Sequence, residues 1–339
     1  RQHGQNGALS MGYYDATDLP YYWNLADDYV LFDRFFSSAA DGSLPNRMFW
    51  LTGTAGNTTG QIPANGFGDL PTIFDVLNRQ GITWKFYVQN YNQRLTYRTV
   101  KDGGAAAQVN RVPLLAYDRF IDDPNLSSHI VDLDQYYEDL YNGTLPAVAY
   151  VAAASASEHA PANIQAGQRL VRAMINALMQ SEAWNSSAFL LTYDSWGGWY
   201  DHVAPPKVDN DGYGFRVPAL LISAYARKGY IDSTELDVTS ALKFIEDNYQ
   251  LPPLATRDGQ AKSLAGAFDF TRPPRRPHMI TATRETTQVV EPRRDIVYAG
   301  YSSMIVLAGI VMVVAIALAG GNHRQKKLGQ QHISQEGAS

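Results

Sequence analysis

An uncharged stretch near the C-terminus most limits what this chain can fold into. The segment from Val297 to Gly321 contains no Asp, Glu, Lys or Arg and includes the run MIVLAGIVMVVAIALAG. A helix rises about 1.5 Å per residue, so about 20 apolar residues cross the hydrocarbon core of a bilayer. The alternative is a buried core helix, but core helices are rarely this long and this uniformly apolar. We therefore predict a transmembrane helix over residues 297–321.

The charges that flank this stretch indicate its orientation. Arg324 and two lysines follow it, whereas Arg293 and Arg294 are the basic residues close before it. The positive-inside rule then favours a cytoplasmic tail over residues 322–339. We expect a single-pass protein of the cell membrane whose body lies outside the cytoplasm.

Composition narrows the function classes open to the rest of the chain. Of its 339 residues, 45% are hydrophobic and 18% are charged, which is typical of a globular protein. The formal net charge of -5 shows no basic excess, so we expect no nucleic-acid partner. There are no cysteines, which excludes disulfides, thiolate zinc sites and thiol nucleophiles. A metal ion would have to be bound by Asp, Glu, His, Asn or hydroxyl groups.

Residues 1–270 show strand and helix patterns in alternation. Five short apolar runs predict strands covered on both faces, at residues 29–32, 83–88, 147–151, 188–193 and 219–222. Helical periodicity is clear in IQAGQRLVRAMINALMQS and in TSALKFIEDNY. This alternation predicts an α/β domain in which helices cover both faces of a mostly parallel sheet. Ligands of such domains bind beyond the carboxyl ends of the strands. A linker rich in Pro and Arg is expected over residues 271–296.

The segment AADGSLPNRMFWLTG carries a candidate nucleophile. Gly42 allows a tight turn that leaves Ser43 open to a ligand, and a metal ion could lower the pKa of its hydroxyl. Asn46 and Arg47 could contact phosphate oxygens, Arg47 through its planar guanidinium. Taken alone, such a turn is more often the capped N-terminus of a helix.

Two later segments carry candidate ligands for metal and phosphate. In SASEHAPANIQAGQRL, His159 could bind a metal ion or phosphate, or could cap the following helix. In FLLTYDSWGGWYDHVAPP, Asp194 and Asp201 are candidate ligands of a divalent cation. His202 is a candidate contact for substrate, oriented by the neighbouring Asp201. The alternative for this segment is a structural turn packed by its aromatic residues.

Taken together, these segments resemble the phosphoesterase family of phospholipases C and acid phosphatases, within the alkaline phosphatase superfamily. The matching stretches run in order over about residues 10–270: GSLPNR, SEHAPANIQAGQRLV, TYDSWGGWYDHVAPP, YGFRVPALLISAYARKGYID and FIEDNYQLPPL. The resemblance implies a three-layer α/β/α alkaline-phosphatase-like domain and a divalent metal ion. It matches Ser43 with the family's hydroxyl nucleophile, His159 with a histidine that donates to phosphate, and Asp194 with a metal ligand. Arg216 matches a position with a structural role.

The sequence departs from the family pattern in two respects. The Glu-Asn metal-binding motif with which the family opens does not occur in the printed residues. Ser195 stands where the family has the second member of an acidic pair. We therefore expect an N-terminally truncated phosphoesterase domain over residues 1–270 with part of a metal site.

Two functions are compatible with these features. The first is metal-dependent hydrolysis of phosphate esters through a phosphoserine at Ser43, with phospholipid as the substrate because a membrane helix would hold the site near head groups. The second is a degenerate, non-catalytic binding protein on the membrane. A sulfatase or phosphonate-cleaving activity is a weaker third, because sulfatase nucleophiles lie in a different local motif.

Overall fold

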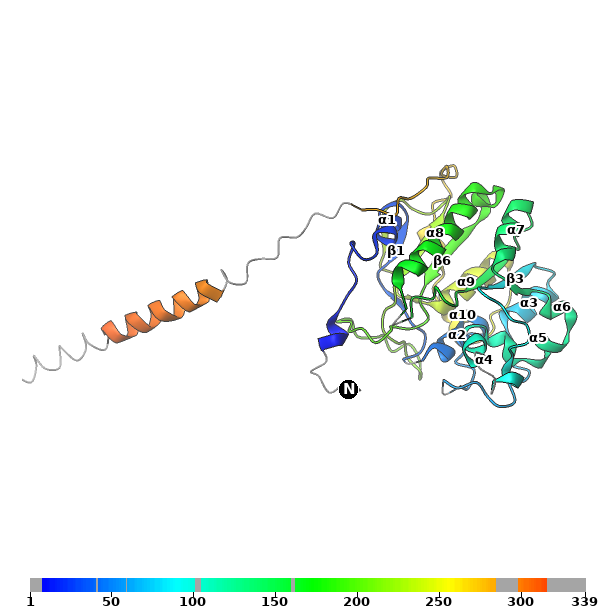
Figure 1. Cartoon of the computed structure of the whole chain (residues 1–339), viewed down its shortest axis with the longest axis horizontal. Helices are drawn as coiled ribbons and strands as arrows, with labels where there is room; N and C mark the ends of the chain where they lie inside the picture. The colour runs from blue at the N-terminus through cyan, green and yellow to red at the C-terminus, as the bar shows by residue number, and fades with distance from the viewer. Residues whose placement is uncertain are drawn as a thin grey trace, which may run out of the picture. The chain divides into compact units, whose positions relative to one another are not determined.

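The computed structural model of the chain divides into two units, residues 1–284 and residues 285–339, shown in Figure 1. The residues that the structure describes are 8–40, 42–58, 60–100, 105–159, 162–284 and 298–315.

The first sheet of the body is mixed. Its four strands follow the order β6-β7-β1-β8. Their bounds are β1 Val30–Phe32, β6 Ala188–Thr192, β7 Ala219–Ser223 and β8 Tyr230–Asp232. Strand β7 is antiparallel to both of its neighbours, whereas β1 and β8 are parallel. Every residue of β7 is buried, as expected for a strand with helices on both faces.

The second sheet is parallel throughout. It has the order β4-β3-β5, with β3 at Trp84–Val88, β4 at Ile130–Asp132 and β5 at Val148–Ala152. A short parallel pair joins β2 (Phe35–Phe36) to β9 (Leu236–Asp237). The five strands expected from the sequence are confirmed. The expected parallel arrangement is confirmed for the second sheet. Within the described residues, the first sheet is not hydrogen-bonded to the second, and its strand β7 is antiparallel to its neighbours.

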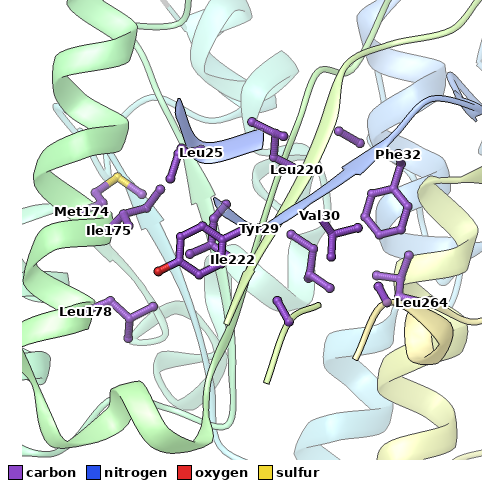
Figure 2. Packing of buried hydrophobic residues seen from close by; sticks show 14 of the residues in the cluster. Leu25, Tyr29, Val30, Phe32, Met174, Ile175, Leu178, Leu220, Ile222 and Leu264 are labelled. Carbon is purple, nitrogen blue, oxygen red and sulfur yellow. The ribbon is translucent and has the colours of Figure 1, made fainter. Parts of the chain in front are cut away.

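One helical layer consists of α1 (Pro20–Asp28), α7 (Asp134–Asn142) and α8 (Ile164–Gln180). Helix α8 begins where the Asn163 side chain accepts a hydrogen bond from the Gln165 amide. Its apolar positions fall on one side and are buried against β1 and β7. Figure 2 shows this packing, with Met174, Ile175 and Leu178 of α8 on one side of the strands and Leu264 on the other.

The opposite layer consists of α2 (Ser43–Thr52), α3 (Ile73–Arg79) and α9 (Val238–Tyr249). The alternation along β3 shows that the sheet lies between the two layers. Trp84, Phe86 and Val88 pack with residues of α2 and α3, whereas Tyr87 packs on the other side with Tyr136 of α7. The expected three layers, α/β/α, are present.

Shorter helices connect these elements. They are η1 Ala8–Met11, η2 Tyr97–Thr99, α4 Ala105–Arg111, η3 Pro113–Ala116, α5 Asp118–Asp122, α6 Pro124–Ser127, η4 Glu182–Ser186, α10 Thr256–Gln260 and η5 Leu264–Ala267. Most are too short to show a helical period in the sequence.

Residues 271–284, expected as the first part of a linker, pack on the body. The Arg275 side chain donates to the Asp28 carbonyl oxygen (2.7 Å) and lies over the Tyr29 ring. The Asn24 side chain donates to the carbonyl oxygens of Thr281 and Thr283. The side chains of Arg275 and Asn24 thus bind this Pro-rich segment to α1. The composition of the segment alone does not indicate these contacts. The rest of the expected linker, 285–296, lies outside the described residues.

In the second unit, the described residues form one helix, Tyr298–Ala315. By length and composition it could cross a membrane, and its side chains are exposed along its whole length. The remainder of the expected span and the tail, with Arg324, lie outside the described residues.

Candidate functional site

Ser43 begins helix α2, directly after a turn that requires glycine. Gly42 has φ of 82°, and a Cβ built on it would lie 3.3 Å from the Pro45 ring. The Ser43 side chain is half-buried in the first turn of a ten-residue helix. Backbone N–H groups in a first turn lack helical partners and carry partial positive charge. Ser43 therefore lies where an anionic group is stabilised.

Asn46 holds the loop that precedes Ser43. It is fully buried, and its side chain accepts from the Ala39 amide (2.7 Å) and donates to the Gly42 carbonyl oxygen (2.9 Å). The side-chain amide of Asn46 is thus hydrogen-bonded to backbone groups. The contact with substrate expected for Asn46 stays a prediction. In the structure, the Asn46 side chain stabilises the turn at Gly42.

The same loop is held from a second direction. The Ser38 hydroxyl donates to Asp237 (2.6 Å), which also accepts from the Thr239 hydroxyl (2.5 Å). Burial raises the pKa of Asp237 above its ordinary value. Arg257 forms a bidentate pair with Asp209 and donates to the Ser38 carbonyl oxygen. The backbone before Ser43 is therefore fixed by buried polar contacts.

Arg47 joins α2 to the end of β6. Its Nη2 lies 2.6 Å from Oδ2 of Asp194, and the two side chains are 25% and 23% exposed. Burial lowers the pKa of Arg47, and the Asp194 carboxylate opposes this. Residues four apart lie on the same face of a helix, so Ser43 and Arg47 lie on the same face of α2. The structure thus pairs Arg47 with Asp194, and Ser43 lies one helical turn before Arg47 on α2. The sequence analysis selected all three residues.

Glu158, which the sequence analysis did not select, lies between two tyrosines. Its carboxylate accepts from the Tyr22 hydroxyl (2.6 Å) and from the Tyr193 hydroxyl. Burial raises the pKa of Glu158. Gly167 of α8 makes room for this carboxyl group, because a Cβ there would overlap it. The matching block SEHAPANIQAGQRLV contains both Glu158 and Gly167, but no sequence signal pointed to Tyr22.

The remaining predicted residues lie at the surface or in ion pairs. His159 is exposed, and the His202 side chain is 79% exposed with its Nδ1 3.8 Å from Asp201. Arg216 binds both oxygens of Asp201 (2.7 and 2.8 Å) and donates to the Asp33 carbonyl oxygen. The Arg216 guanidinium thereby lowers the pKa of Asp201. These contacts agree with the structural role expected for Arg216.

The described side chains do not make a metal centre on their own. Among them, no three His, Cys, Asp or Glu residues lie close enough together to share an ion. Both expected ligands already have a cationic partner, Asp194 in Arg47 and Asp201 in Arg216. A divalent cation needs several oxygen ligands, so these residues alone do not fit one.

A cavity of about 860 Å³ opens between β5 and β6. At the carboxyl ends of the two strands it is lined by Arg47, Arg111, Glu158 and Asp194. The Arg111 Nε is buried without a hydrogen-bond partner among the described residues, and burial lowers the pKa of Arg111. The guanidinium groups of Arg47 and Arg111 suit phosphate oxygens. The sequence analysis missed Arg111, which lies in a short helix without a recognisable motif.

Sequence comparison shows the family to which this chain belongs. The model of the Phosphoesterase family matches residues 1–252, and the chain belongs to this family. It is 29% identical to the non-hemolytic phospholipase C of Burkholderia pseudomallei (strain K96243), over 79% of this chain and 46% of that protein. It is 28% identical to phospholipase C A of Mycobacterium tuberculosis (strain ATCC 25618 / H37Rv), over 78% and 58%. It is 26% identical to non-specific phospholipase C6 of Arabidopsis thaliana, over 87% and 60%.

The chain therefore spans about half the length of these relatives. The solved structures that match include a protein in the alkaline phosphatase superfamily from Vibrio parahaemolyticus. It is 15% identical, with a TM-score of 0.43, over 71% of this chain and 63% of that one.

Proposed function

We propose that this protein hydrolyses phosphate esters and that its substrate is a phospholipid, cleaved in the manner of a phospholipase C. The observation that supports this most is the position of Ser43 in the first turn of α2, one turn from the Arg47–Asp194 pair. The names of the phospholipase C relatives support the choice of substrate.

In the proposed reaction, Ser43 Oγ attacks phosphorus and loses its proton to solvent. The bond from phosphorus to the lipid alkoxide breaks, and the alkoxide takes up a proton and leaves as diacylglycerol. Water then attacks the phosphoserine, releases the phosphorylated head group and restores the Ser43 hydroxyl. Arg47, Arg111 and the first-turn amides of α2 stabilise the charge on the phosphoryl oxygens. His159 and His202 are the residues we assign to further hydrogen bonds with the substrate.

A divalent metal ion, implied by the family resemblance, is part of this proposal. Asp194 and Asp201 are the ligands that the described residues offer, and further oxygen ligands must come from elsewhere in the protein. Elemental analysis of purified protein measures whether a metal is present and which one.

We also propose that the protein is anchored in the cell membrane through the helix that includes Tyr298–Ala315, with its body outside the cytoplasm. The length and composition of this helix support the anchor. The flanking basic residues support the orientation.

Substitution of Ser43 tests the reaction. The assay uses phosphatidylcholine in mixed micelles and p-nitrophenyl phosphate, each with Mg²⁺, Ca²⁺, Mn²⁺ or Zn²⁺ added. We expect Ser43→Ala to lower kcat by about 10³-fold or more, because loss of a nucleophile removes the covalent route. Ser128→Ala, in the loop before β4, is the control and should keep full activity. A Ser43→Ala variant as active as the parent would overturn the mechanism.

The ion pairs at Asp194 and Asp201 favour one alternative, a non-catalytic binding protein. That protein would show no turnover with any of the four cations but would still bind phosphatidylcholine vesicles. Vesicle sedimentation alongside the activity assay separates the two functions.

A further inference from the structure

The connection from β6 to β7 turns two aromatic side chains towards solvent. Gly197 has φ of 70°, and a Cβ built on it would lie 3.3 Å from the Trp199 ring. Before this turn, the Trp196 ring packs against Phe215, with 5.0 Å between the ring centroids. After it, Trp199 and Tyr200 are 36% and 61% exposed. The aromatic residues around the turn therefore divide into one that packs inwards and two that remain at the surface.

A second segment extends this surface. The Tyr200 amide donates to the Ser10 carbonyl oxygen (2.7 Å), and the Tyr14 ring packs edge-on against Trp199 with 5.6 Å between the centroids. In Figure 1 the connection (green) accordingly lies beside η1 (dark blue). We call the exposed large side chains of the two segments the aromatic patch: Met11, Tyr13, Tyr14, Trp199 and Tyr200. A group of exposed aromatic side chains of this kind marks an interaction site.

The aromatic patch borders the candidate site. Burial raises the pKa of Tyr193, and the charges of Glu158 and Tyr14 raise it further, so Tyr14 of the patch lies near this pair. Tyr193 donates to Glu158, which lines the same end of the cavity as Asp194. A ligand that covers the patch is therefore held next to the candidate site.

Ion pairs fix the connection on both sides of its two exposed aromatic residues. Arg47 binds Asp194 before them, and Arg216 binds Asp201 after them. Arg216 also donates to the Asp33 carbonyl oxygen of the body. A surface that is already ordered loses little conformational entropy when it binds a partner.

The chemistry of the two segments selects the partner. Trp and Tyr side chains combine an apolar ring with a polar group and are typical of the boundary between lipid and water. Residues 8–18 and 194–206 contain four Asp and no Lys or Arg, so they do not attract an anionic lipid surface. A zwitterionic surface with choline head groups fits, because aromatic faces attract quaternary ammonium groups.

We propose that the aromatic patch binds a zwitterionic lipid surface that bears choline head groups, and that it holds the candidate site at this surface. The proposal rests on the proposed function, since it supplies the way in which a phospholipid substrate is approached. In this arrangement the rings of Tyr13, Trp199 and Tyr200 lie at the level of the head groups, with choline ammonium groups against their faces.

Nitroxide labelling tests the docking surface without reference to turnover. The chain has no native cysteine, so Gly12→Cys labels an exposed position of the first segment and leaves all five side chains of the patch in place. Tyr141→Cys on α7, where the native ring is 91% exposed, is the control. With the full chain in phosphatidylcholine nanodiscs, we expect the label at position 12 to collide with a water-soluble nickel chelate about 3-fold less often than the label at position 141, since interfacial groups are partly buried among head groups.

Nanodiscs of phosphatidylglycerol, which is anionic, should give a smaller difference between the two labels. Equal collision rates at positions 12 and 141 in phosphatidylcholine overturn the proposal. Equal protection of position 12 in both lipids would show that protein, such as a second copy of this chain, covers the patch, and this also overturns the proposal.

Enzyme kinetics provide a second measurement. We expect Tyr13→Ser combined with Tyr200→Ser to lower the ratio of phosphatidylcholine hydrolysis in mixed micelles to p-nitrophenyl phosphate hydrolysis by about 10-fold, because two ring contacts with head groups are lost. Tyr141→Ser is the control and should keep the ratio of the parent. A double variant with the parent's ratio overturns the proposal. A parent protein that hydrolyses neither substrate contradicts the proposed function, and the nitroxide labels then decide the docking surface alone.

Discussion

Arg47 and Asp194 form an ion pair 2.6 Å long between helix α2 and the segment that follows β6. The two residues are 147 positions apart in the sequence, and their pairing connects the helix of the candidate nucleophile to β6, the edge strand of the first sheet. Each side chain is about three-quarters buried. Removal of either side chain leaves the charge of the other one partly buried and without its partner.

We expect Arg47→Met to lower the free energy of unfolding by about 1–3 kcal/mol, because the Asp194 carboxylate loses its partner. Adding Asp194→Asn should recover part of this loss. Arg79→Met, at an exposed position of α3, is the control and should stay within about 0.5 kcal/mol of the parent. Urea unfolding followed by circular dichroism measures all four proteins. An Arg47→Met variant as stable as Arg79→Met would show that the pair contributes nothing.

Gly167 and Glu158 should show a strong non-additive effect. Gly167→Ala should destabilise the protein, since the new methyl group overlaps the Glu158 carboxyl group. In a Glu158→Ala background that space is empty, and Gly167→Ala should then stabilise α8 by up to about 1 kcal/mol. A double-mutant cycle from thermal unfolding measures the interaction. Additive effects of the two substitutions would contradict the contact.

The buried carboxyl group of Glu246 should make stability depend on pH. Burial and the nearby charge of Asp258 raise the pKa of Glu246 from its ordinary 4.5 to about 8. The folded state therefore favours the neutral group. Its contribution to stability is complete below pH 4.5 and is lost as the pH rises towards 8. We expect Glu246→Gln to flatten the decrease in unfolding free energy over this range, measured by urea unfolding at several pH values. The exposed Glu138→Gln is the control, and equal slopes in the two variants would contradict the prediction.

The C-terminal helix should hold the protein in membranes during an alkaline carbonate wash. Leu307→Arg places a charge near the middle of Tyr298–Ala315, which costs about 2.5–3.5 kcal/mol in a bilayer. We expect this variant to appear largely in the supernatant. Ser302→Arg, nearer the end of the helix, should stay mostly in the pellet because its side chain reaches the interface. A parent protein that the wash releases would contradict the membrane anchor.

The strands were predictable because a strand covered on both faces needs a continuous apolar run, and such runs are local in the sequence. The direction of β7 and the separation of the two sheets were not predictable, since strand pairing depends on residues far apart in the chain. The same distinction holds for the site. Ser43, Arg47 and Asp194 stand in short recognisable segments, whereas Glu158 acquires its surroundings from Tyr22, 136 positions away. Asn46 shows a further limit, because an amide suited to phosphate is equally suited to backbone groups.

The reversed direction of β7 has a consequence for how this site can vary. Strands β6 and β7 are antiparallel neighbours, with Thr192 opposite Ala219. The chain therefore leaves β6 and enters β7 at the same end of the sheet. The whole connection of residues 193–218, including Asp194 and Asp201, therefore stays on the side of the candidate nucleophile. Insertions or deletions that spare Asp209 and Arg216 change the surroundings of the candidate site and keep the contacts of this connection with Arg257 and with the Asp33 carbonyl oxygen. The surroundings of the candidate site can thus diverge through a single connection between two strands.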